Sequence, residues 1–246
     1  PEALEAARAI QDEKYRADAL SALADKLPPE LLPEALEAAR EIQSKTSRAD
    51  ALIVLTDKLP ELLPEALEAA RAIQDERYRA DALSALADKL PPELLPEALE
   101  AARAIQDERY RADALSALAD KLPELLPEAL KAARAIQDER YRADALSALA
   151  DKLPELLPEA LEAARAIQDE EYRADALSAL ASGLSQMPNA KLFPLWQDTL
   201  HQLSLRTRPN LLQDITALFP VIFALGGKAA TAELARAIGD VARWWK

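Results

Sequence analysis

The chain has 246 residues, no cysteine and a formal net charge of −13, and only 4% of its residues are aromatic. The absence of cysteine excludes disulfides, thiolate catalysis and cysteine-based zinc sites. The acidity is concentrated in residues 1–181, which carry 39 acidic and 23 basic side chains, whereas residues 182–246 carry 4 and 7. An acidic surface repels phosphate groups, so we expect neither nucleic acid nor a membrane surface as a partner.

A repeated unit occupies most of the chain. It reads PEALEAARAIQDERYRADALSALADKLPELL, and successive copies begin 31 or 32 residues apart. The six copies begin at Pro1, Pro33, Pro64, Pro96, Pro127 and Pro158. Thirteen of the 17 prolines lie where one copy meets the next, and no residue between these junctions breaks a helix. The period therefore predicts six near-identical two-helix repeats in residues 1–181 and a divergent segment in residues 182–246.

The fifth copy illustrates the predicted helix pair. Helix A extends from about Pro127 to Ile136, after a short helical turn in residues 123–126. Helix B follows Asp138, whose side chain can accept hydrogen bonds from the first-turn amides, and it ends before Pro154. Polar side chains at helical spacing form a solvent-facing stripe on helix B: Arg140, Asp144, Ser147 and Asp151. The tyrosine that recurs near the start of helix B is predicted to pack between helices.

Two short helices cannot bury apolar faces of this width alone, so successive units must stack. The predicted fold is an all-α, right-handed α-solenoid of helical-hairpin repeats of 31–32 residues with a divergent C-terminal cap. It resembles the tetratricopeptide-like and HEAT-like arrays. In a tetratricopeptide-like packing, helix A lines the inner surface and offers Glu97, Glu100 and Arg103 to a partner.

Residues 182–246 are predicted to be degenerate repeats that cap the array. One helix is expected at residues 195–205. A second is expected at residues 209–225, bent at Pro220 and ended by the glycine pair that follows it. The longest apolar run of the chain lies within this second helix and is too short to span a bilayer.

The repeated sequence ALEAARAIQDERYRADALSALADKLPELLPEALEAA is followed by LFPLWQDTL, RPNLLQDITALFPVIFALGG and ARAIGDVARWW. This succession resembles the C-terminal helical-repeat regions of bacterial multidomain signalling NTPases. In those proteins a nucleotide-binding switch and an effector domain precede the repeats, and the repeats serve as the sensor. The resemblance covers the whole chain and implies a sensor for a protein or peptide. Because the chain begins at Pro1 without a methionine, we expect it to be part of a larger protein.

The sequence offers no recognisable catalytic, metal or cofactor site. The single histidine, His201, has no partner near it in sequence. Asp107 and Glu108 recur in most copies, as a helix-capping pattern must, whereas a catalytic site is not normally built several times over. We therefore expect a cytoplasmic protein without enzymatic activity and without a cofactor.

The second copy departs most from the others. It differs from the fourth at eight of 31 positions, whereas the fifth differs only at Lys131. Thr46 and Ile53 fall on the polar stripe of helix B, where an exposed β-branched side chain can mark a partner contact, although sequence drift is the simpler explanation. The alternative to a recognition module is a passive spacer or an engineered scaffold with no specific ligand, since near-identical units offer little specificity.

The first copy has no repeat before it in this sequence. Leu4, Ala7, Ile10 and Tyr15 are therefore predicted to be open to water. Exposed apolar area of this kind favours association, so the first repeat is expected either to fray or to self-associate through this surface.

Overall fold

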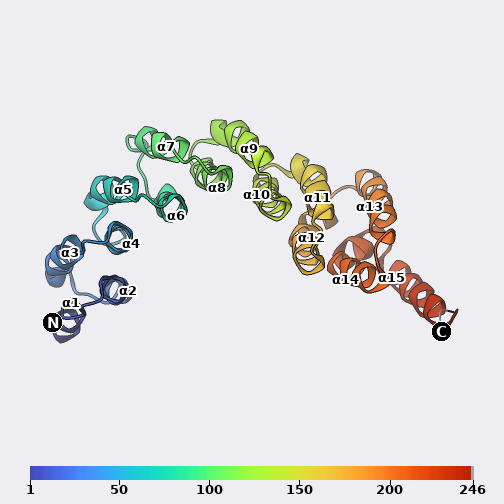
Figure 1. Cartoon of the computed structure of the whole chain (residues 1–246), viewed down its shortest axis with the longest axis horizontal. Coiled ribbons are helices and arrows are strands. Elements are labelled where there is room, and N and C mark those ends of the chain that lie inside the picture. The colour runs from blue at the N-terminus through green and yellow to red at the C-terminus, as the bar shows by residue number, and fades with distance from the viewer. Residues whose placement is uncertain (245–246) are drawn as a thin grey trace. The chain divides into compact units, whose positions relative to one another are not determined.

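A computed structural model describes residues 1–244, and the regular elements in that range are fifteen α-helices and four short 3₁₀ turns. No strand occurs among the described residues. The helices pack in chain order with their neighbours, which confirms the all-α helical-repeat solenoid (Figure 1). The chain divides into two compact units, Pro1–Ala132 and Ala133–Lys246.

Each copy of the repeat forms a helical hairpin. The A helices are α1 (Glu2–Arg8), α3 (Leu32–Arg40), α5 (Leu63–Arg71), α7 (Leu95–Arg103), α9 (Leu126–Ala135) and α11 (Leu157–Ala166). The B helices are α2 (Glu13–Ala24), α4 (Lys45–Leu55), α6 (Glu76–Ala87), α8 (Glu108–Leu118), α10 (Glu139–Lys152) and α12 (Glu170–Ser185). The 3₁₀ turns are Pro29–Leu31, Pro60–Leu62, Pro123–Leu125 and Pro154–Leu156, and each leads directly into an A helix. Both helices predicted for the fifth copy are therefore present.

A capping side chain fixes the start of each B helix. Asp138 accepts hydrogen bonds from the backbone amides of Arg140 and Tyr141, at 3.0 and 3.1 Å. Ser44 replaces the aspartate in the second copy, and its hydroxyl accepts from the amide of Ser47 at 3.3 Å. First-turn amides have no partner within the helix, so one residue per copy determines where the second helix begins.

In the unit Pro1–Ala132 the B helices form an inner row and the A helices an outer row (Figure 1). Successive B helices pack directly on one another, whereas contacts between successive A helices are few. The B helices place fully buried alanines such as Ala49, Ala80 and Ala112 in the core, and small side chains permit close helix approach. This arrangement differs from a tetratricopeptide-like packing, in which helix A would line the inner surface.

Ion pairs connect successive A helices. Arg40 donates to both carboxylate oxygens of Glu65, at 2.8 and 2.6 Å, and Arg103 makes the same two-bond contact with Glu128, at 2.8 and 2.7 Å. These hydrogen bonds lower the pKa of Glu65 and of Glu128. Exposed pairs of this kind contribute at most about 1 kcal/mol each, so they add little to the free energy of unfolding.

A glutamate at the first position of helix B also reaches the next repeat. Glu76 accepts hydrogen bonds from the backbone amides of Gln106 and Asp107, both at 2.9 Å. Glu13 does the same with the amides of Gln43 and Ser44, at 2.8 and 2.7 Å. These bonds favour the ionised carboxylate and lower the pKa of both glutamates. The second copy has Lys45 at this position and cannot make the contact.

The C-terminal segment contains α13 (Asn189–Ser204), α14 (Arg208–Ala217) and α15 (Phe219–Trp244). The single helix predicted at residues 209–225 is broken at Leu218, where the helices Arg208–Ala217 and Phe219–Asp240 are bent by 80° relative to each other. Pro220 lies in the first turn of α15, where the backbone amide has no helical partner to lose, so the break precedes the proline.

The glycine pair interrupts the helix, as predicted, because Gly227 has a φ of 59° and a ψ of −152°. This ψ lies outside the left-handed helical region expected for a cap, and a second helix follows directly after the kink, so α15 consists of two helices. Residues 236–240, RAIGD, match RAIQD at residues 134–138 in sequence but lie inside α15, whereas the repeat copy spans the end of an A helix.

The first repeat is less open than predicted. Leu4 is only 1% exposed and Ala7 is also buried, because both pack within their own hairpin, where α1 contacts α2. Ile10 is half-buried, while Tyr15 is 64% exposed, as predicted. Leu23 is partly exposed although its counterparts in the second to fourth repeats are buried, so some apolar surface is open at this end.

Candidate functional site

The inner row of the unit Pro1–Ala132 carries one exposed aspartate at the same position of successive B helices. Asp18, Asp50 and Asp81, here called the acidic row, project from α2, α4 and α6. Partial burial raises the pKa of Asp50, and the negative charges of Asp18 and Asp81 raise it further. The three carboxylates therefore repel one another, and a cation held along the acidic row would relieve that repulsion.

A second set of aspartates, directly after the C-terminal ends of α2 and α4, is paired with lysines. Asp25 lies near Lys58 of the next repeat, with Oδ1 and Nζ 3.8 Å apart. Asp57 forms a closer pair with Lys89, at 2.8 Å. Because these aspartates have lysine partners from the neighbouring repeat, the acidic row is the part of this surface that attracts a basic group.

The candidate contact residues on helix A are exposed on α7, in the outer row. Glu97 forms an ion pair with Arg71, with Oε1 and Nη1 3.1 Å apart, and Arg103 forms an ion pair with Glu128. Glu100 is exposed on the same helix. The structure therefore places all three on one helix but engages two of them in links between repeats.

The candidate contact patch in the second repeat does not form as predicted. Thr46 is half-buried at the start of α4, but Ile53 is only 5% exposed. The Ile53 carbonyl accepts hydrogen bonds from the Thr56 hydroxyl at 2.6 Å and from Lys89 of the next repeat at 3.3 Å. This position lies where two repeats meet, so Ile53 extends the core and was wrongly assigned to a solvent-facing stripe.

The recurring tyrosines are more exposed than predicted. Tyr15, Tyr78 and Tyr172 are exposed in the first turn of their B helices. Arg140 lies over the ring of Tyr172, with Cζ 3.5 Å from the ring centre, as in a cation–π contact. The expectation of packing between helices is therefore wrong for Tyr78 and Tyr172, whereas exposure of Tyr15 was predicted because it belongs to the first repeat.

The described part of the chain contains no group of three or more His, Asp or Glu side chains that could hold a metal ion. His201 is exposed on α13. Within residues 1–244 no single helix has the length and hydropathy of a membrane span, and the bent pair Arg208–Ala217 and Phe219–Asp240 meets that criterion only when its two helices are taken together.

These features define an all-helical repeat protein with an acidic B-helix surface. No family model matches the chain, and no curated protein matches it. Among solved structures, a similar chain is described as "Computational Design of Self-Assembling Cyclic Protein Homooligomers". The two chains are 20% identical, the similarity covers 96% of this chain and 92% of the other, and the TM-score is 0.23.

Proposed function

We propose that the chain is a non-catalytic repeat scaffold that binds a positively charged segment of a protein or peptide along its B helices. The observation that carries this proposal is the acidic row, in which Asp18, Asp50 and Asp81 are neighbours and the pKa of Asp50 is raised. The negative charge of residues 1–181 attracts basic segments and speeds their encounter with this surface.

Under this proposal the array is the recognition part of a larger cytoplasmic bacterial signalling protein and has no enzymatic activity of its own. The support for this broader role is the sequence resemblance to the repeat regions of signalling NTPases. The acidic row adds a chemical preference to it, because a ladder of carboxylates selects lysine and arginine side chains over acidic or apolar ones.

A passive spacer or an engineered scaffold is the second candidate. The observation in its favour is the near identity of the fourth and fifth repeats, which differ only at Lys131. A spacer needs a stable, uniform stack and no partner. The two candidates predict different results when charge is removed from the acidic row. A recognition module then binds a basic peptide more weakly, whereas a passive spacer has no specific binding to lose.

The variant Asp18→Asn, Asp50→Asn is expected to bind a fluorescent oligolysine peptide about fivefold more weakly than the unmodified chain. Each exposed ion pair contributes up to about 1 kcal/mol, and two of them are lost. Fluorescence anisotropy at low ionic strength measures the affinity, because salt screens exposed charges.

The matched control is Asp25→Asn, Asp57→Asn, which removes the same charge from the same two repeats, just after the ends of α2 and α4. Those aspartates have lysine partners, so this variant is expected to change the affinity by less than about twofold. Equal losses in both variants would show that only net charge matters and would refute the acidic row as the binding surface. A chain that does not bind oligolysine at all would favour the spacer.

A further inference from the structure

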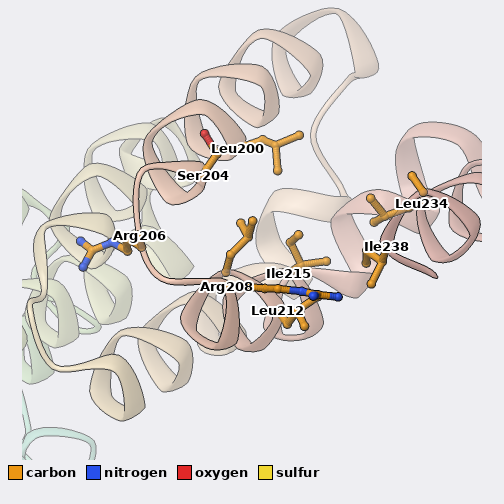
Figure 2. A pocket seen from close by; sticks show the side chains of 10 residues that line it. Leu200, Ser204, Arg206, Arg208, Leu212, Ile215, Leu234 and Ile238 are labelled. Carbon is orange, nitrogen blue, oxygen red and sulfur yellow. The ribbon is translucent and has the colours of Figure 1, made fainter. Parts of the chain in front are cut away.

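An open apolar pocket lies between α13, α14 and the second part of α15, in the unit Ala133–Lys246 (Figure 2). Its volume is about 630 Å³. Leucine and isoleucine side chains from all three helices form its walls: Leu200, Leu212, Ile215, Leu234 and Ile238. A volume of this size is within the range of small-molecule sites, about 300–1,000 Å³.

The pocket exists because α15 changes direction at Gly227. Beyond this residue no side chain of the described residues 228–240 is buried. Leu234 and Ile238 lie one helical turn apart and face Ile215 and Leu212 across the pocket (Figure 2). All but Ile215 remain partly exposed, so the pocket offers apolar surface that a ligand can cover.

Arg208 gives the pocket a charged end. It is the first residue of α14, and its guanidinium lies beside Leu212 and Ile215 (Figure 2). Among the described residues no carboxylate lies within ion-pair distance of Arg208. The second arginine of the pocket, Arg206, is engaged elsewhere, since it donates to the Arg165 carbonyl at 2.8 Å and its guanidinium points away from the apolar walls.

We propose that this pocket binds a single-chain amphiphilic carboxylate, such as a medium-chain fatty acid. The hydrocarbon tail lies among the leucine and isoleucine side chains, and the carboxylate pairs with Arg208. A guanidinium matches a carboxylate with two parallel hydrogen bonds, and in this acidic protein Arg208 is a cation that no acidic side chain of the described residues satisfies. The site is separate from the acidic row and does not depend on the proposed function.

Isothermal titration calorimetry of the full chain with decanoate, below its micelle concentration, tests this site. Decanol is the uncharged comparison with the same chain length. We expect saturable binding of decanoate, about tenfold tighter than that of decanol. Arg208→Gln should remove this difference and leave decanol binding unchanged. Arg236→Gln is the matched control, because Arg236 is an exposed arginine of α15 paired with Glu233, and it should leave both affinities unchanged.

The proposal is overturned if decanoate does not bind saturably, or if Arg208→Gln leaves the preference for decanoate intact. Hydrogen exchange gives a second readout that is independent of affinity. Residues 228–240 should become more strongly protected when decanoate binds. Exchange rates in these residues that do not change on addition of decanoate would contradict the site.

Discussion

Replacing Asp214 by alanine is expected to lower the free energy of unfolding of the unit Ala133–Lys246 by about 3–5 kcal/mol. Asp214 of α14 and Arg173 of α12 are both 0% exposed, and the Arg173 Nε lies 2.9 Å from Oδ2 of Asp214. Arg173 Nη1 also donates to the Ile167 carbonyl at 3.1 Å. Without the carboxylate, the guanidinium is a buried charge with no counterion, and this is the source of the large loss.

A double variant tests whether the charges of Arg173 and Asp214 stabilise the unit only as a pair. Burial raises the pKa of Asp214, and the hydrogen bonds from Arg173 act in the opposite direction. Arg173→Met combined with Asp214→Leu removes both charges and should recover most of the lost stability. Urea unfolding followed by circular dichroism measures all variants.

The exposed ion pair of Arg236 with Glu233 provides the control for this experiment. Its two side chains lie on the surface of α15, and Glu233→Ala should change stability by less than about 0.5 kcal/mol. A cost below about 1 kcal/mol for Asp214→Ala would contradict the description of the Arg173 pair as buried and essential for this unit.

Leu115→Ala is expected to destabilise the unit Pro1–Ala132 by about 2–5 kcal/mol, because it leaves a cavity at a fully buried position of α8. Repeats contact only their neighbours, so the loss should appear first as local opening of the fourth repeat and the repeats beside it. Urea unfolding gives the total cost, and hydrogen exchange shows where the opening begins.

Glu100→Ala is the surface control for the same repeat and should cost less than about 0.5 kcal/mol. Uniform loss of protection over all repeats in the Leu115→Ala variant would contradict nearest-neighbour packing. It would show instead that the unit opens as a whole.

The repeat fold could be predicted because each copy carries its own boundary signals. Prolines mark the junctions, and a capping residue such as Asp138 marks the start of helix B. The buried alanines and leucines follow from helical spacing alone. The break at Leu218 could not be found in this way, because apolar residues continue at helical spacing on both sides of it.

The contacts between repeats were not predictable from local pattern. Glu76 bonds to amides 30 residues away, and Arg173 pairs with a carboxylate 41 residues away. Pairings at this distance depend on how helices stack, which spacing within one helix does not encode. Which helix of each hairpin forms the inner row also depends on contacts with the neighbouring repeat. The burial of Ile53 depends on the same contacts.

The most direct test of the central claim is to find which carboxylates touch a bound basic peptide. A carbodiimide joins a lysine amine to a carboxylate only where the two are in contact, and mass spectrometry identifies the site. The tryptic peptide at residues 49–58 is unique to the second repeat, and fragmentation of this peptide distinguishes a cross-link at Asp50 from one at Asp57. We predict cross-links to Asp50 in excess of those to Glu37 of α3 and Glu100 of α7, two outer-row residues that lie in tryptic peptides of identical sequence and are therefore counted together. Equal labelling of Asp50 and of these outer-row residues, or preferential labelling of the outer row, would contradict binding along the B helices.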